Sequence, residues 1–517
     1  MGALIVDVAV IAACFALVRG WIRRAARLPL ASYRAPVIAV ELVRHPSALA
    51  PLIVPALPVL AAWERTSWAA FAATPWLRPF IVALALAGSA ALATHAYNRF
   101  YRRAHVLDRG LLIALASLTA VHPVFVVPCA GFTAVVMFQL VAPFWADGGI
   151  APVFHKLVLG DVMIALIGAL YLQPFAPRAA QHFVVFVLAE VAGCYVHSAI
   201  EKLKLDWIRQ CDLVGLVTAA VAHGWWPPRR RALATALARL VDRCRGGILV
   251  AVVALELAPA LIGFSTPAAV AVLVGLAAFH LAIHAISGMN FLPWVVLNVA
   301  LAGVLLDAGP GALTGGAEGV VVLAVLAVAP YVLDPIRLAW LDARLCNAYV
   351  IRAVDDRGRR WEASPRVFAP YDFPFALGKF HFLTDTRLLV DAWSETCDAS
   401  LVRRLRAVST AGEIAALERE RGQAHHDERL AAALHRFLAQ VLTGGPTPRA
   451  MAWLSRLPLA TDWFGPQDPP WRAGDVTVRA VEVSIRRVLY RPEGFLVIDD
   501  ELVATLPLSP HAEGRAS

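Results

Sequence analysis

Long runs of apolar residues recur along the first two thirds of the chain. A membrane-spanning helix needs about 20 mostly apolar residues. Runs of about that length lie at residues 3–19, 47–63, 80–97, 110–128, 129–145, 153–172, 181–201, 247–264, 267–287, 291–306 and 319–338. Three of them (47–63, 129–145 and 291–306) are short or contain proline. The pattern therefore predicts about nine to eleven transmembrane helices.

Residues 225–245 follow a different pattern. From Arg229 onward, charged residues alternate with apolar ones at helical spacing, and Leu233, Leu237, Leu240 and Val241 fall on one face. Such a basic amphipathic helix is typical of a membrane surface, where its arginines would suit anionic headgroups. We expect a surface helix here rather than a membrane span.

After about residue 340, apolar and polar residues alternate, which predicts strands. One alternating segment flanks "DDRG" at 355–358, and another, at 476–490, runs into the turn "RPEG". Residues 385–442 have the charged, amphipathic pattern of helices. The expected fold is an α-helical polytopic membrane protein followed by a soluble mixed α+β domain. The expected divisions are 1–74 (N-terminal membrane segments), 75–340 (helical membrane domain), 341–504 (soluble domain) and 505–517 (disordered tail).

Composition supports a bilayer as the partner and gives no reason to expect nucleic acid. Of 517 residues, 59% are hydrophobic and 16% are charged, against about 25% charged in typical soluble domains. The net charge of +9 comes largely from arginines in short loops beside apolar runs, such as Arg102 and Arg230. Cytoplasmic loops are enriched in this way. The bias toward Ala, Arg and Trp suggests a bacterium with a GC-rich genome. The expected location is therefore a bacterial cell membrane.

The seven cysteines show no CxxC spacing, so we expect neither a zinc site nor a disulfide framework. Reduced Cys346 and Cys397 favour a cytoplasmic C-terminal domain. Eleven spans with the arginine loops inside would place it there as well.

Ionisable residues at membrane depth are candidates for function. Lys202 is one, because a desolvated lysine loses part of its preference for the charged form and can act as a base. A helix-end lysine can instead extend to the headgroups. Lys204 is about 200° further round the helix, so the two lysines cannot share one environment. His280 and His284, four residues apart, could ligate a metal or bond to neighbouring helices; without an HExxH motif we predict no metal.

The segment "SAIEKLKLDW" (198–207) resembles the one that carries the catalytic lysine of vitamin K-dependent gamma-glutamyl carboxylases. A second stretch, "FHLAIHAISGMNFLPW" (279–294), is similar to the family helix in which Phe-His precedes a Ser/Gly/Met run and Pro-Trp. Glu256, with Pro259 three residues later, fits the family helix before this stretch. The likeness covers about residues 75–340. Bacterial relatives of this kind are the horizontally transferred transmembrane (HTTM) domain proteins.

The resemblance implies that Lys202 is the base and that His122 is the nearest match to a catalytic histidine. Glu190, Glu256, His280, His284 and Trp294 would then surround a reduced naphthoquinone, either menaquinol or vitamin K hydroquinone. The deprotonated quinol would react with oxygen, and the product would remove a proton from a carbon acid, for example in a protein or peptide, to which carbon dioxide can add.

The sequence departs from the family at several positions. Ser198, Ala199, Ile208 and Arg209 stand where many relatives have glycine nearby, and Glu201 precedes the base. The family's large luminal domain is not recognisable after residue 340. Two other interpretations therefore stay open: a non-enzymatic membrane scaffold, transporter or lipid-binding module, and a metal oxygenase built on His280 and His284.

Overall fold

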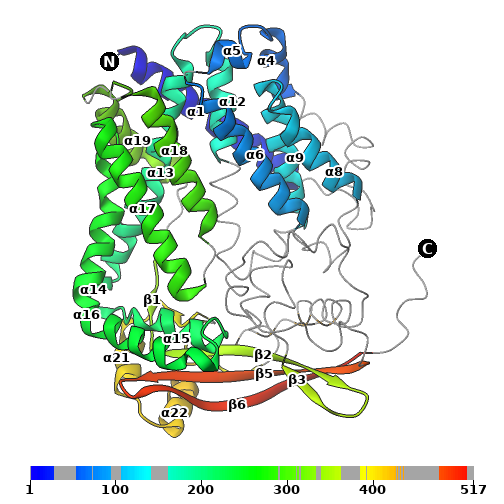
Figure 1. The fold of residues 1–517 in the computed structure, drawn as a ribbon, viewed down its shortest axis with the longest axis vertical. Helices are drawn as coiled ribbons and strands as arrows, with labels where there is room; N and C mark the ends of the chain where they lie inside the picture. The colour runs from blue at the N-terminus through cyan, green and yellow to red at the C-terminus, as the bar shows by residue number, and fades with distance from the viewer. Residues whose placement is uncertain are drawn as a thin grey trace. The chain divides into compact units, whose positions relative to one another are not determined.

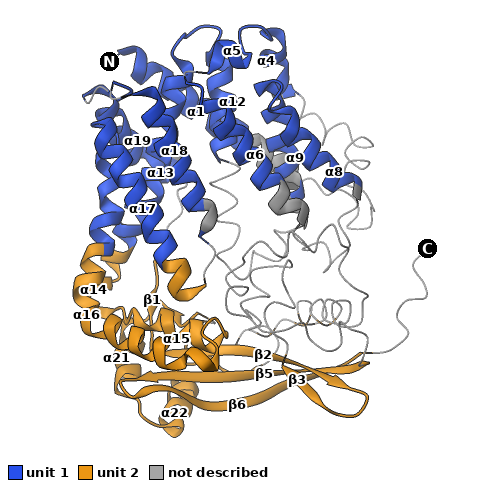
Figure 2. Cartoon of the chain, viewed as in Figure 1, with its two compact units in different colours: residues 1–201, 252–282, 291–338 blue, residues 202–251, 283–290, 339–517 orange. Residues whose placement is uncertain are grey.

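The computed structural model describes most of the chain. The described residues are 2–27, 54–72, 74–94, 106–140, 161–288, 291–309, 311–313, 316–333, 339–362, 385–391, 393–424 and 477–508, with single positions between 426 and 435. They form two compact units that are interleaved along the chain (Figure 2). Unit 1 comprises Met1–Glu201, Val252–Ala282 and Phe291–Leu338, and unit 2 comprises Lys202–Ala251, Ile283–Asn290 and Ala339–Ser517.

Unit 1 is helical (Figure 1). Its helices are α1 (Gly2–Arg27), α4 (Leu57–Ala61), α5 (Trp68–Phe71), α6 (Leu77–Thr94), α8 (Val106–Leu118), α9 (Val126–Leu140), α12 (Val162–Leu172), α18 (Leu292–Ala308) and α19 (Ala317–Val332), with most of α13 (Ala179–Lys204) and α17 (Thr266–Ser287). Short 3₁₀ turns lie at η1 (Val54–Ala56), η2 (Pro123–Phe125) and η5 (Ala258–Leu261). Helix α12 and much of α13 are apolar and buried on every side, which makes them the core of this unit.

Among the described residues, four helices are long and apolar enough to cross a membrane: Gly2–Gly20, Ala179–Lys204, Pro228–Leu261 and Thr266–Ser287. Shorter apolar helices lie at Leu77–Ser89, Pro123–Thr133, Val162–Leu172, Trp294–Ala308 and Ala317–Tyr331. The predicted helical character of these runs is confirmed. Five predicted runs lie partly outside the described residues: 47–63, 80–97, 129–145, 153–172 and 319–338.

The predicted surface helix and the span after it are one continuous helix, α16 (Arg231–Leu257), so the expected break near residue 246 is wrong. The predicted apolar face is correct for Val241, which is buried, and for Leu237, which packs against buried residues, but not for the other two leucines. Leu233 and Leu240 are each 57% exposed, whereas Ala234 and Ala238 are fully buried. The reason is packing: the alanines let α16 come close to Trp225, Trp226 and other side chains of unit 2.

The predicted boundary between the runs 110–128 and 129–145 is also displaced. Helix α8 ends at Leu118, and α9 begins at Val126. Between them, His122 has an extended backbone and precedes Pro123 at the start of η2. Because the residue before a proline is disfavoured in the helical region, the chain breaks here.

Unit 2 combines helices and strands, as the alternating pattern predicted. A four-stranded antiparallel sheet has the order β3 (Arg360–Glu362), β2 (Leu345–Asp355), β5 (Val478–Arg491), β6 (Gly494–Pro507). A smaller sheet pairs β1 (Leu341–Asp342) with β4 (Glu395–Thr396). The helices are α14 (Trp207–Gln210), α15 (Val214–Ala222), most of α16, α21 (Ala399–Ala407) and α22 (Ala411–Arg421), with a 3₁₀ turn η4 (Pro228–Arg230).

Both predicted hairpins are confirmed. Strands β2 and β3 pair across the "DDRG" turn, where Gly358 has a φ of +75° that favours glycine. Strands β5 and β6 pair down to Arg491 opposite Gly494. Strand β6 continues to Pro507, past the predicted boundary at 504, because its last residues still pair with Ala480 and Val481. Residues 509–517, and most of the predicted helix after 424, lie outside the described residues.

Three contacts join segments of unit 2 that are distant in the chain. The indole nitrogens of Trp225 and Trp226 donate to the carbonyl oxygens of Ala285 and Ile286, which ties the end of α17 to the start of α16. Gly215 of α15 lies against the backbone of Ala343, where any Cβ atom would collide. This close approach places Cys211, Asp212 and Asp342 beside one another.

Candidate functional site

A hydrogen-bonded polar cluster lies in the apolar core of unit 1. The Tyr195 hydroxyl is 2.7 Å from Nε2 of His280, and Nδ2 of Asn298 donates to the same hydroxyl at 3.0 Å. All three side chains are buried, and they come from α13, α17 and α18. With Asn298 donating, the hydroxyl can donate in turn to a neutral His280. The cluster therefore contains hydrogen-bonding groups without requiring a net charge.

Aromatic rings surround this cluster. Phe291 stacks on His280 with ring centres 4.8 Å apart, and Trp294 lies 5.7 Å from His280 and 5.4 Å from Tyr195. These separations fall in the range at which aromatic rings attract one another. The predicted residues His280 and Trp294 are thus neighbours.

The two predicted carboxylates are both buried in unit 1, but they differ in position. Glu256, near the end of α16, is close enough to Tyr195 to act on it electrostatically. Glu190 precedes Tyr195 by five residues in α13, which puts it about 140° round the helix from the tyrosine. Glu256 therefore lies near Tyr195, whereas Glu190 is on another face of α13.

His284 has a different partner from His280. Its ring lies 5.9 Å from that of Trp225, within unit 2. Within the described residues, no group of three or more His, Cys, Asp or Glu side chains is placed to hold a metal ion. The two histidines share a helix face but not an environment.

His122 lies at the turn between α8 and α9. Its Nδ1 accepts a hydrogen bond from the backbone of Val124 at 3.1 Å, so its Nε2 carries the proton and donates to the carbonyl oxygen of Trp63 at 2.9 Å. The ring also stacks on Trp63, with centres 3.6 Å apart. Both nitrogens are engaged with backbone groups, which is the arrangement of a structural cap.

Lys202 lies in the last turn of α13 and is partly buried, whereas Lys204 is exposed. Its Nζ is 5.4 Å from the centre of the Trp207 ring, a cation–π distance. Asp206 makes this possible: its left-handed backbone (φ +53°) ends α13 and starts α14, which carries Trp207. An aspartate tolerates that conformation better than most residues.

A buried carboxyl lies near Lys202 within unit 2. Asp342 accepts from the Cys211 thiol at 3.3 Å and from the Trp340 indole at 3.3 Å. Burial raises the pKa of Asp342 to about 7, although both donors and the charge of Lys202 lower it. Burial likewise raises the pKa of the Cys211 thiol well above its ordinary value. Asp342 is therefore a proton-binding group that titrates near neutral pH.

The raised pKa of Asp342 predicts a pH-dependent stability. Its contribution is fully present below the ordinary pKa of 3.8 and is lost as the pH rises to about 7. Between pH 5 and 7 the wild type should lose about 1.4 kcal/mol of unfolding free energy per pH unit relative to Asp342→Asn. Denaturant melts of both proteins at several pH values measure this difference. The exposed control Asp356→Asn should show the same pH dependence of unfolding free energy as the wild type. The same result for Asp342→Asn would contradict the raised pKa of Asp342.

Next to Asp342, a fully buried carboxylate is held by arginines. The oxygens of Asp212 lie 3.0 Å from Arg344, 3.0 Å from Arg406 and 3.6 Å from Arg245. Arg344 directly precedes β2, Arg406 lies in α21 and Arg245 lies in α16. Arg344 also contacts Asp242 at 2.9 Å. Asp212 thus joins three separate segments of unit 2.

Sequence reasoning missed Tyr195, Asn298 and Asp212. Asn298 is a lone amide within the apolar segment "VVLNVALAG", and that isolation was a usable signal. Tyr195 and Asp212 gave no such signal, because a tyrosine is common in apolar helices and an aspartate near a helix end usually faces solvent.

No family model matches the chain, and comparisons with curated proteins and with solved structures gave no significant match. The resemblance carried by the two motifs stays a prediction.

Proposed function

We propose that this chain is a multi-pass protein of a bacterial cell membrane that binds a reduced naphthoquinone, such as menaquinol, among α13, α17 and α18. The observation that carries the proposal is the cluster of Tyr195, His280 and Asn298. It is buried, needs no net charge and is flanked by the rings of Phe291 and Trp294. The apolar helices of membrane-spanning length support the location.

A quinol suits such a place for simple chemical reasons. It is a neutral aromatic ring with two hydroxyl groups, so it dissolves in a bilayer and needs hydrogen-bond partners once it leaves water. Tyrosine, histidine and asparagine can each donate or accept. Aromatic side chains offer faces and edges to the quinol ring.

The family resemblance extends the proposal to a reaction. A neutral Lys202 would accept a proton from a quinol hydroxyl, and dioxygen would add to the ring of the resulting anion. One oxygen atom ends in the quinone epoxide and the other in water. The strongly basic intermediate would remove a proton from a carbon acid, and carbon dioxide could then add to the carbanion. Support comes from the partial burial of Lys202 beside an exposed Lys204.

Unit 2 would then face the cytoplasm, where the arginines of η4 and α16 would lie near anionic headgroups. It would offer its sheet and helices to a protein or peptide that supplies the carbon acid. Neither role requires a metal.

Aerobic incubation of the purified protein with reduced menaquinone tests the proposal, with the epoxide detected by mass spectrometry. We expect epoxide from the wild type. Tyr195→Phe removes one hydrogen-bonding hydroxyl from the cluster, so it should raise the KM for menaquinol about tenfold. Tyr331→Phe removes the hydroxyl of a residue that is 88% exposed and should leave the KM unchanged. Folded wild-type protein that forms no epoxide from confirmed quinol would overturn the reaction.

A non-enzymatic membrane module is the second candidate. The position of Lys202 favours it, because a cation–π contact with Trp207 and attraction to Asp342 are both roles for a charged, structural lysine. The non-enzymatic module predicts that folded wild-type protein forms no epoxide and that Lys202→Arg, which keeps the charge, leaves the fold intact.

A further inference from the structure

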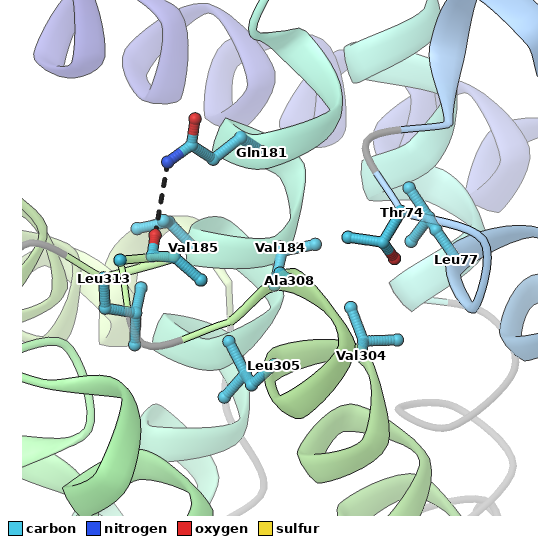
Figure 3. A pocket seen from close by; sticks show the side chains of 11 residues that line it. Thr74, Leu77, Gln181, Val184, Val185, Val304, Leu305, Ala308 and Leu313 are labelled. Atoms are coloured by element: carbon cyan, nitrogen blue, oxygen red, sulfur yellow. Dashed lines mark hydrogen bonds between the residues drawn. The ribbon is translucent and has the colours of Figure 1, made fainter.

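A cavity of about 250 Å³ lies among α6, α13, α18 and the turn after α18 (Figure 3). It belongs wholly to unit 1. Its lining consists of Thr74, Leu77, Gln181, Val184, Val185, Val304, Leu305, Ala308, Gly311, Ala312 and Leu313. None of these eleven residues carries a charge, and most of the side chains are aliphatic. The cavity is thus suited to an uncharged and mainly apolar occupant.

One polar group of the lining has no hydrogen-bond partner among the described residues. The hydroxyl oxygen of Thr74 is buried and makes no hydrogen bond to any residue that the structure describes. A buried hydroxyl without a partner costs about 1–3 kcal/mol, so an occupant that bonds to it would recover that free energy. Gln181, on the other side of the aliphatic side chains in Figure 3, already donates to the carbonyl oxygen of Ala312 at 3.2 Å.

We propose that this cavity binds a neutral lipid alcohol, with its hydroxyl on Thr74 and its hydrocarbon chain against Val184, Val304 and Leu305. The absence of charge on the lining residues disfavours a carboxylate or a phosphate, which would be buried without a counter-charge. A purely hydrocarbon occupant would leave the Thr74 hydroxyl unsatisfied. The volume is slightly below that of pockets for drug-sized ligands, about 300–1,000 Å³, so a single short chain fits.

This site is separate from the proposed reaction. Within α13, the lining residue Val185 precedes Tyr195 by ten residues and Lys202 by seventeen. These spacings correspond to about 15 Å and about 25 Å along the helix. The lipid-alcohol proposal therefore does not depend on quinol oxygenation, and its test does not measure that reaction.

Photolabelling with an octanol that carries a diazirine tests the proposal on the full-length purified protein. Peptide mass spectrometry should find the adduct on segments 181–185 or 304–313. Unlabelled octanol should compete at least tenfold better than octanoate or octane of the same chain length. Adducts elsewhere only, or equal competition by octanoate, would overturn the proposal.

Variants of the lining distinguish the contribution of the Thr74 hydroxyl to binding from that of the cavity volume. Thr74→Val keeps the shape but removes the oxygen, so labelling should fall about fivefold to tenfold. Thr74→Ser should restore it. Val304→Phe fills the space and should abolish labelling. Thr133→Val alters a buried threonine outside the lining and should change nothing. Unchanged labelling in both Thr74→Val and Val304→Phe would show that the probe binds somewhere else.

Discussion

Replacing Lys202 by alanine should lower epoxide formation from menaquinol by about 100-fold or more, because a general base typically contributes that much to a rate. The expectation rests on the resemblance of "SAIEKLKLDW" to the carboxylase segment and on the partial burial of Lys202 at the end of α13. The initial rate of epoxide formation under saturating oxygen measures the effect. Near-wild-type activity would exclude Lys202 as the base.

Two further variants distinguish a base from a structural charge. Lys204→Ala removes an exposed lysine from the same helix end and should leave the rate unchanged. Lys202→Arg keeps a positive charge that can contact Trp207 and attract Asp342, but a guanidinium does not give up its proton in a protein. A base role therefore predicts an inactive, well-folded Lys202→Arg protein. An active Lys202→Arg protein would instead show that Lys202 acts as a structural charge and that another group is the base.

Replacing Asp212 by asparagine should destabilise unit 2 by about 3–5 kcal/mol. The variant leaves Arg245, Arg344 and Arg406 facing a neutral amide in place of a fully buried carboxylate. Because these arginines come from three separate segments, their repulsion would loosen α16, α21 and the start of β2 together. For a unit of this size the melting temperature should fall by about 10 °C.

The control for this prediction is Asp242→Asn. Asp242 contacts only Arg344 among the ion pairs of the described residues, and its side chain is 25% exposed. A partly exposed pair of this kind contributes about 0–1 kcal/mol. Thermal melts followed by circular dichroism compare the variants. An equal fall in melting temperature for Asp212→Asn and Asp242→Asn would mean that the buried carboxylate of Asp212 stabilises unit 2 no more than the partly exposed one of Asp242.

The hydropathy pattern determined which segments are helices and which are strands. Apolar runs became helices because such residues must be covered, whether by lipid or by other helices. The alternation around "DDRG" and "RPEG" became hairpins because side chains of a strand point to opposite faces in turn. Element boundaries were less accurate where a particular residue decided them, as at His122 before Pro123 and at the end of β6.

Tertiary packing determined which helix positions are buried and which side chains meet, and the hydropathy pattern does not predict either. Near the start of α16, Ala234 is buried while Leu233 is exposed, since close contact with Trp225 and Trp226 requires a small side chain. The same limit applies to the sites. The sequence alone singled out Lys202, His280 and Trp294 as residues of unusual type or motif. Only the tertiary structure placed Asn298 beside Tyr195, three arginines around Asp212 and the Thr74 hydroxyl in a cavity, because each arrangement joins segments distant in the chain.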